Sequence, residues 1–246
     1  MKIKISLRST LCILTGIFVT GCIVINGDGF ETGRIYGSGT VISEERVVPV
    51  FDQIHLKGSG KVILTRAASH SVQIKTDDNI MPYIRTEVDN GRLVIFHERK
   101  YIRPTILTYY ITAANLEGVS IAGSGDISGH DDFDADRFYA DISGSGDLSL
   151  RLRTERLESN ISGSGSIYLS GATNFYDATI TGSGDVDAFE LQAGKSSVVI
   201  TGSGNCRVNA SELLRAKITG SGDVLYKGHP KIRKSITGSG KVKHRD

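Results

Sequence analysis

The stretch that decides the fold is Ile180-Thr181-Gly182-Ser183-Gly184-Asp185, and the same six residues return at Ile218–Asp223. The triplet Gly-Ser-Gly occurs nine times, beginning at Gly37, Gly58, Gly123, Gly144, Gly163, Gly182, Gly202, Gly220 and Gly238. From Gly123 onward, successive triplets lie 21, 19, 19, 20, 18 and 18 residues apart. Such regular spacing is typical of a stacked structural repeat.

Apolar residues bracket every late triplet. The residue two positions before each triplet is isoleucine: Ile121, Ile142, Ile161, Ile180, Ile200, Ile218 and Ile236. Four positions after the first glycine stands Ile127, Leu148, Ile167, Val186, Cys206, Val224 or Val242. Alternating β-branched and polar residues predict strands, and the glycines between them predict a sharp corner. The pattern therefore predicts a parallel β-solenoid with rungs of about 20 residues.

Further apolar positions are expected to complete one continuous core. They are Leu150, Leu152, Leu157, Leu191, Val198 and Leu213. Ordering a rung costs on the order of 20 to 40 kcal/mol of backbone entropy. Burying two aliphatic side chains returns only about 3 to 6 kcal/mol. Single rungs are therefore not expected to fold without their neighbours.

The N-terminus carries the features of an export signal. Residues 1–21 combine Lys2, Lys4 and Arg8 with an apolar run that is too short to span a bilayer comfortably. The end of this segment, Val19-Thr20-Gly21-Cys22, resembles a bacterial lipobox, whose cleavage would leave an acylated Cys22. No acidic residue follows directly, which resembles the sorting pattern of outer-membrane lipoproteins in Gram-negative bacteria. Several acyl chains on Cys22 would hold the chain firmly on a membrane.

Charge and cysteine content narrow the function classes. Removal of residues 1–21 takes away three basic and no acidic residues, so the formal charge changes from +2 to −1, and nucleic-acid binding is not expected. Cys12 would leave with the signal, and a lipidated Cys22 cannot form a disulfide with Cys206. The position of Cys206 predicts a small buried hydrophobic residue. Neither a disulfide nor a cysteine metal site is expected.

The remaining chain is expected to divide into three parts. Residues 22–45 form a Gly-rich tether, 46–112 a smaller β section and 113–243 the solenoid repeats. In the smaller section, Thr76–Ile84 has acidic residues and helical spacing that predict one short helical turn with acidic caps. Asp89-Asn90-Gly91 predicts a hairpin turn.

Several ordered segments together resemble a known bacterial family, the head GIN domain, described as a putative auto-transporter adhesin. They are the Phe51-Asp52-x-Ile54 segment before a Gly-Ser-Gly, Asp77-Asp78-Asn79, Asn90-Gly91-x-Leu93, and the later Gly-Ser-Gly-Asp rungs. The resemblance covers residues 46–243. It implies a right-handed parallel β-helix that is secreted or lipid-anchored. It supplies no catalytic residues.

Interpretations of the motifs as phosphate-binding, calcium-binding or other metal sites are less favoured. No helix is expected after any triplet, so the glycines do not predict a phosphate-binding loop. A calcium-binding hand that began with Asp132–Asp136 would need glycine at its sixth place and glutamate at its twelfth, where this sequence has Arg137 and Ser143. The histidines, His55, His70, His97, His130, His229 and His244, show no metal-ligand spacing, so no metal site and no cofactor are expected. Asp126, Asp147, Asp185 and Asp223 follow their corners directly and form a candidate binding face.

The last 20 residues gather basic side chains: Lys227, Lys231, Arg233, Lys234, Lys241, Lys243 and Arg245. They could contact anionic envelope polymers. The interpretation we favour is that they protect the open edge of the last rung from pairing.

We expect a lipid-anchored protein of the cell envelope that is not an enzyme and acts as an adhesin-like or structural binding module. Its expected partners are the membrane, through Cys22, and glycans or envelope proteins. The alternative is a carbohydrate-active β-helix enzyme, a polysaccharide lyase or hydrolase. A carboxylate pair and a basic residue converging in one groove would favour that alternative.

Overall fold

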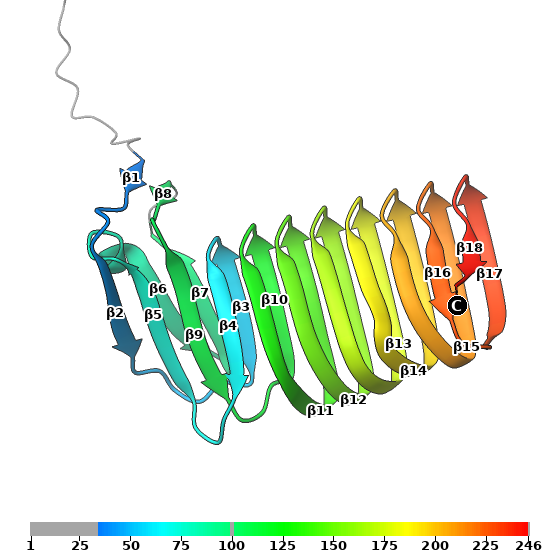
Figure 1. Cartoon of the computed structure of the whole chain (residues 1–246), viewed down its shortest axis with the longest axis horizontal. Helices are drawn as coiled ribbons and strands as arrows, with labels where there is room; N and C mark the ends of the chain where they lie inside the picture. The colour runs from blue at the N-terminus through cyan, green and yellow to red at the C-terminus, as the bar shows by residue number, and fades with distance from the viewer. Residues whose placement is uncertain (1–33, 99–100, 246) are drawn as a thin grey trace, which may run out of the picture. The chain divides into compact units, whose positions relative to one another are not determined.

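The computed structural model describes residues 34–98 and 101–245. The chain divides into two units, residues 1–33 and 34–246, and all the described residues belong to the second. Its strands stand side by side from β2 at one end to β17 and β18 at the other (Figure 1). Among the described residues, no helix is long and apolar enough to cross a membrane.

The second unit is built almost entirely of strands. They are β1 (Ile35–Tyr36), β2 (Val41–Arg46), β3 (Gln53–Gly58), β4 (Lys61–Arg66), β5 (Ser71–Asp77), β6 (Ile84–Asp89), β7 (Arg92–His97), β8 (Ile102–Arg103), β9 (Leu107–Ala113), β10 (Gly118–Gly123), β11 (Asp126–Gly144), β12 (Asp147–Gly163), β13 (Ser166–Gly182), β14 (Asp185–Gly202), β15 (Cys206–Gly220), β16 (Val224–Lys227), β17 (Lys231–Gly238) and β18 (Val242–His244). A single 3-10 turn, η1 (Met81–Tyr83), lies between β5 and β6.

The predicted β-solenoid is confirmed. Strands β10 to β18 pair in parallel, and each of the long strands β11 to β15 runs from one corner around the rung to the next corner. The stretches that follow the corners, with β4, β16 and β18, are called the first sheet. The stretches that precede the corners, with β3, β10 and β17, are called the second, opposite sheet. Each isoleucine of the repeat lies in register with the isoleucine of the next rung, from Ile121 to Ile236. The second apolar column, from Ile127 to Val242, is also in register. Both columns are buried except in the last rung, where Ile236 is 36% exposed.

The corner needs glycine for two physical reasons. Gly182 has φ +117°, a backbone conformation that side-chain-bearing residues rarely adopt. A Cβ atom on Gly182 would lie 2.5 Å from the backbone oxygen of Gly163 in the preceding rung. The serine between the glycines donates its backbone N–H to that rung, as Ser183 does to Gly163 O at 2.9 Å. The triplets thus form a hydrogen-bonded ladder of their own.

The stack begins earlier than the sequence predicts. Strands β3 and β4, placed in the smaller β section, pair in register with β10 and β11, and Gly58 stands opposite Gly123. The triplet at Gly58 is therefore a corner of the same stack. The 65 residues from Gly58 to Gly123 hide this in the sequence, because they contain the strands β5 to β9 that close this end of the solenoid.

Half of the predicted tether, residues 22–33, lies outside the described residues, but the other half, residues 34–45, belongs to the folded unit. Strand β2, within the predicted tether, pairs antiparallel with β5. The Gly37 triplet before it is held by the Asp77-Asp78-Asn79 segment. Gly39 N donates to Asp77 Oδ1 at 2.9 Å, and Ser38 N donates to Asn79 Oδ1 at 3.0 Å.

The hydrogen bonds between the Gly37 loop and Asp77 and Asn79, here called the clasp, correct one detail of the sequence prediction. The short helical turn exists as η1, but its N-cap residue is Ile80, and no side chain caps it. The acidic residues bind the Gly37 loop instead. Burial would raise the pKa of Asp77, but hydrogen bonds from Thr105 and Gly39 outweigh burial and hold that pKa below its usual range.

Two further predictions can be compared with the structure. The hairpin at Asn90-Gly91 joins β6 to β7, and both turn residues have positive φ, as a type I′ turn requires. Leu213 is only half-buried, whereas its neighbour Leu214 is fully buried. The prediction of Leu213 in the core is therefore wrong. A register irregularity between Ala193 and Lys195 places Leu213 opposite Lys195 and turns it outward.

Candidate functional site

An outward column of side chains runs along one sheet of the solenoid, one residue beyond the buried aliphatic column. Its members stand in register on successive rungs: Ser128, Ser149, Tyr168, Asp187, Arg207, Leu225 and Lys243. In a β-sheet such positions lie about 4.8 Å apart from strand to strand. The column therefore presents a row of different chemical groups at a fixed spacing.

Two hollows adjoin each other on this sheet. One, of about 440 Å³, is lined by His130, Arg151, Phe189 and Glu190 among others, and a second, of about 340 Å³, by Asp185, Asn205, Arg207 and Asp223. Tyr168 and Asp187 line both hollows, so they stand on the boundary between them. We call this surface the Tyr168 trough.

Tyr168 is the main apolar surface of the trough. Its side chain is 49% exposed, although it stands in the middle of the stack, on β13 between β12 and β14. Rigid aromatic side chains of this kind offer a large contact area at low entropic cost, and the hydroxyl adds a polar end.

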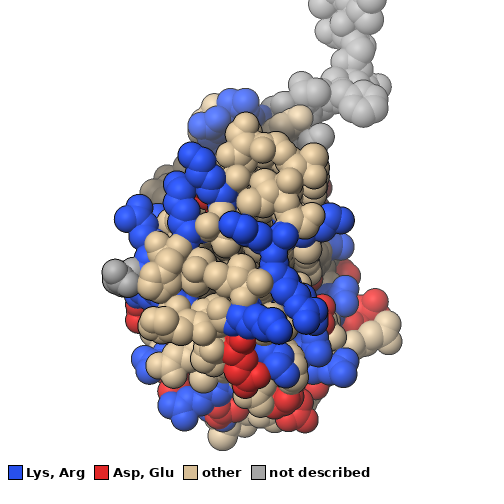
Figure 2. Space-filling model, turned by 90° about the vertical axis from the view of Figure 1, so that its right-hand side faces the viewer, with Lys and Arg blue, Asp and Glu red and all other residues tan. Residues whose placement is uncertain are grey.

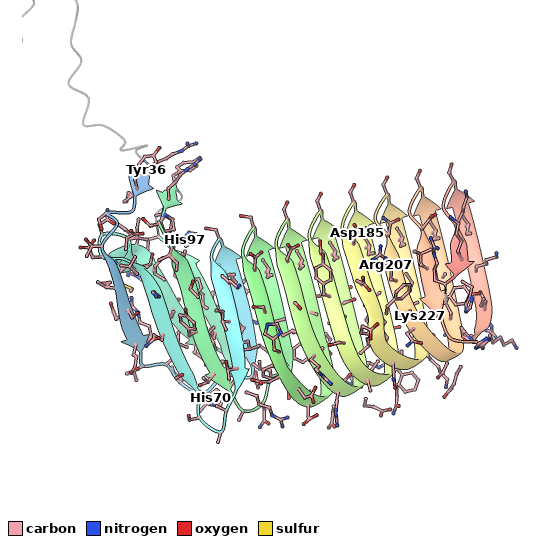
Figure 3. The ribbon with its side chains drawn as sticks, viewed as in Figure 1. Tyr36, His70, His97, Asp185, Arg207 and Lys227 are labelled. Carbon is pink, nitrogen blue, oxygen red and sulfur yellow. The ribbon has the colours of Figure 1, made fainter. Side chains whose placement is uncertain are left out.

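Charged groups flank Tyr168 on the following rungs. Arg207 Nη1 donates to Asp187 Oδ2 at 2.9 Å, and Lys227 Nζ lies 3.5 Å from Glu190 Oε1. Lys227 Nζ also lies 4.9 Å from the centroid of the Phe189 ring. In Figure 3, Asp185, Arg207 and Lys227 lie on three successive rungs, with Asp185 next to its corner and Lys227 farthest from the corners. These pairs remain accessible, so each can exchange its partner for the hydroxyls of a ligand.

The four predicted binding aspartates adjoin the trough but carry a structural role. Asp185 Oδ1 accepts the backbone N–H of Asn205 in the next rung at 2.8 Å, and Asp223 Oδ1 accepts that of Lys241 at 2.8 Å. Asp126 and Asp147 accept from the following rung in the same way, at 3.3 and 3.2 Å. Only Asp185 and Asp223 line a hollow of the trough. Their role in binding stays a prediction.

The other candidate residues are dispersed. Cys22 lies outside the described residues. Cys206 is fully buried, and burial raises the pKa of its thiol. In the part of the chain that the structure describes, no three His, Cys, Asp or Glu side chains come together as a metal site.

A third hollow, of about 630 Å³, lies on the opposite sheet near β3 and β10. It is lined by His55, Tyr139, Asp141 and Asn160 among others. His55 Nδ1 is hydrogen-bonded to Ser120 Oγ at 2.5 Å, and burial, with Lys57 and Arg92 nearby, lowers the pKa of His55. Small side chains of β10, Gly118, Ser120 and Ala122, line part of this hollow, and its aromatic residue, Tyr139, is 37% exposed, less than Tyr168.

The sequence analysis missed Tyr168, Asp187 and Arg207 as a group. A signal for them was present, because each stands five residues after the first glycine of its triplet. Aligning the repeats by their glycines would have shown that this position is outward and varies from rung to rung.

Comparisons with known proteins agree with the geometry. A family model described as "Putative auto-transporter adhesin, head GIN domain" matches residues 50–230. Among solved structures, a putative adhesin from Bacteroides fragilis is similar to this chain, with 26% identity and a TM-score of 0.82 over 86% of this chain and 100% of that one. A putative lipid binding protein from Parabacteroides distasonis has 27% identity and a TM-score of 0.74 over 87% of this chain and 100% of that one.

A putative adhesin from the same species has 23% identity and a TM-score of 0.72 over 87% of this chain and 100% of that one, which shows a shared fold. The comparison with curated proteins found no match. These matches cover the whole of each solved chain and 86–87% of this one, and residues 34–246 of this chain form a compact unit by themselves. Since the family model matches well over half of the sequence and the solenoid is as expected, the chain belongs to the head GIN domain family.

Proposed function

We propose that this protein is a non-enzymatic binding module of the cell envelope that holds an extended glycan along the Tyr168 trough. The family description and the names of its solved relatives as adhesins support a surface or envelope protein. The observation that carries the proposal is Tyr168, half-exposed on a rigid strand between two adjoining hollows.

The chemistry of the trough suits a sugar chain. A sugar ring has an apolar face that can lie on Tyr168, and hydroxyls that can bond to Asp187, Arg207 and Glu190. The polar groups are fixed by the rung spacing, so little ordering entropy is lost when the ligand binds. A chain of several sugars could contact successive rungs. The binding free energies of these weak contacts would then sum to a measurable affinity.

A lipid ligand is the occupant that one relative's name suggests. The Tyr168 trough offers a less suitable site for acyl chains, because charged groups flank it on both sides. Vesicles therefore form a second arm of the test.

An enzymatic function is the second candidate, since carboxylates and a basic residue do converge in one hollow. Asp185, Asp187, Asp223 and Arg207 all line the smaller hollow of the trough. However, Asp185 and Asp223 accept backbone N–H groups, and Asp187 is paired with Arg207. Asp185 and Asp223 hold the backbone of the next rung, so Asp187 alone is left to exchange its partner for a ligand, and glycoside hydrolysis uses a pair of carboxylates. We therefore favour binding over catalysis.

We further propose that Cys22 carries the lipid that holds the protein on the outer membrane. Residues 23–33 would then link the lipid to the folded unit that begins at Arg34. Radioactive palmitate labelling of the wild type and of Cys22→Ala tests this proposal. Loss of the label in Cys22→Ala is expected, and equal labelling of both would contradict it.

The test of the binding function uses unit 34–246 on an array of envelope and host glycans, with neutral and anionic phospholipid vesicles beside it. Each glycan that binds is then incubated with the protein and analysed for released sugars. We expect binding to a class of extended glycans without release. Binding to vesicles alone would replace the glycan by a lipid, and sugar release would establish the enzyme instead.

A further inference from the structure

The two ends of the solenoid are open sheet edges. At the C-terminal end, β17 pairs only with β15, and β18 pairs only with β16. At the other end, β2 pairs only with β5, and β6 only with β7. Each of these four strands therefore has one side whose backbone groups have no strand partner among the described residues. An unpaired edge is a template for another strand.

The C-terminal end is strongly basic. Lys231, Arg233 and Lys234 lie on β17, and Lys241, Lys243 and Arg245 lie on or beside β18. Figure 2, which views the molecule from this end, shows Lys and Arg side chains spread over the face among uncharged areas, with Asp and Glu side chains gathered toward its lower edge. In the part of the chain that the structure describes, only Lys243 of these six makes an ion pair, with Asp223 at 3.5 Å. All eight residues of β17 are exposed, including Ile232 and Ile236.

The N-terminal end carries acidic residues on the corresponding strands. Glu44 and Glu45 lie on β2, and Glu87 and Asp89 lie on β6. Glu44 pairs with Arg46 of its own strand at 3.0 Å, while Glu45, Glu87 and Asp89 make no ion pair within the described residues. This edge also exposes Val41 and Ile42, at 39% and 38%.

The charges match sheet by sheet. In the first sheet, the strand pairing carries a single outward column from Glu45 on β2, through the position of Tyr168, to Lys243 on β18. In the second sheet, the pairing carries one column from Asp89 on β6 to Arg233 on β17. A second copy placed on the end of the first would therefore bring Lys243 to Glu45 and Arg233 to Asp89.

We propose that copies of this protein associate end to end, with the basic C-terminal edge of one solenoid against the acidic N-terminal edge of the next. Both sheets then continue across the contact, and the exposed isoleucines and valines of the two edges are covered. The same charges repel two like ends, so they give the contact its direction. A contact between two different surfaces does not close, and the product is an open row of solenoids.

This proposal gives the basic residues a role opposite to simple edge protection. If they only prevent pairing, replacing them with neutral residues raises self-association. If they match the acidic edge, the same replacement lowers it. The sign of the change therefore distinguishes the two roles.

The experiment measures the mass of unit 34–246 by analytical ultracentrifugation over a range of protein concentrations, at low and high salt. The wild type is expected to associate at low salt and to dissociate at high salt, because the contact is largely ionic. The double variant Arg233→Glu with Lys243→Glu, and the double variant Glu45→Lys with Asp89→Lys, are each expected to weaken association about tenfold or more, which corresponds to roughly 1.4 kcal/mol.

The decisive sample is an equimolar mixture of the two double variants, in which each reversed edge has a complementary partner. Association is expected to return in the mixture. The control, Arg137→Glu with Arg153→Glu, changes the same amount of charge on exposed residues of β11 and β12, away from both ends, and is expected to behave as the wild type. Circular dichroism confirms that each variant is folded.

Three results would overturn the proposal. They are a wild type that stays monomeric at every concentration and salt level, a mixture that does not recover association, and stronger association after Arg233→Ser with Lys243→Ser. The outcome is independent of glycan binding, because ultracentrifugation measures the mass without any glycan; none of the substituted residues lines a hollow of the trough, and Asp223, which pairs with Lys243, is the only lining residue that loses an ion pair.

Discussion

Ile180 offers the sharpest test of the stacked core, because the same residue type occupies the same repeat position in an exposed setting. Ile180 is fully buried on β13, in register between Ile161 and Ile200. Ile236 holds the equivalent position in the last rung, is 36% exposed and has a neighbour on one side only.

Replacing Ile180 with Ala removes three carbon groups, worth about 2.4 kcal/mol at about 0.8 kcal/mol each. The cavity left between two rungs adds to this, so a total of about 3 to 4 kcal/mol is expected. For a domain of this size, that lowers the melting temperature by about 10 °C. Ile236→Ala is expected to cost about 1 kcal/mol, since much of its side chain is already in water.

Thermal and urea unfolding of unit 34–246, followed by circular dichroism, measures both variants. Equal losses in Ile180→Ala and Ile236→Ala would refute the reasoning, because they would mean that burial between two rungs does not determine the contribution of this position.

Three further predictions concern the corner and the titrating groups. Gly182→Ala is expected to cost about 3 kcal/mol or more in the same unfolding assay, because at this positive φ a Cβ meets the backbone of the preceding rung. Ser183→Ala, on the exposed tip, is expected to cost little. Similar losses in the two variants would contradict the requirement for glycine at the corner. Asp185→Ala is expected to lose about 1 kcal/mol and Asp185→Asn much less, because Asn205 accepts the next backbone N–H at the equivalent position; equal losses in the two variants would exclude this hydrogen bond as the cause. Burial lowers the pKa of His97, so the unfolded chain takes up a proton at a higher pH than the folded chain, as the pH falls through about 6.5. The melting temperature should therefore fall from pH 7 to pH 5.5. If the melting temperature of His97→Gln falls by the same amount over this range, His97 is not the cause.

The repeat architecture could be predicted from the sequence because its physical requirements are local and recur. The isoleucine before each triplet and the aliphatic residue after it must be apolar in every rung, and the two glycines leave no room for a side chain. These constraints leave a periodic signal that a single sequence already contains.

The exceptions arise where the period is broken. Leu213 and Leu214 are both apolar, and only a register irregularity near Lys195 decides which one is buried. The clasp of Asp77 on the Gly37 loop joins residues 38 positions apart, and no spacing rule connects them. Both features depend on which strands become neighbours, which the sequence does not state directly.

The candidate site was less predictable than the fold for a similar reason. The aspartates next to the corners were visible because they recur, and recurrence proved to accompany a structural hydrogen bond. Tyr168, Asp187 and Arg207 stand at one repeat position but differ from each other. A ligand site needs different groups on successive rungs, so it appears in the sequence as irregularity.

Tyr168→Ala measures whether the Tyr168 trough is the binding surface of the protein. Tyr139 is the matched control, since it is a 37% exposed tyrosine on the opposite sheet. The measurement is a titration, by isothermal calorimetry, of both variants with the glycan that binds the wild type best on the array. Removing an aromatic contact at the centre of a site typically costs about 2 kcal/mol or more, so Tyr168→Ala should weaken binding more than tenfold. Tyr139→Ala should bind as the wild type does. Unchanged affinity in Tyr168→Ala, or a larger loss in Tyr139→Ala, would contradict the account and move the site to the opposite sheet.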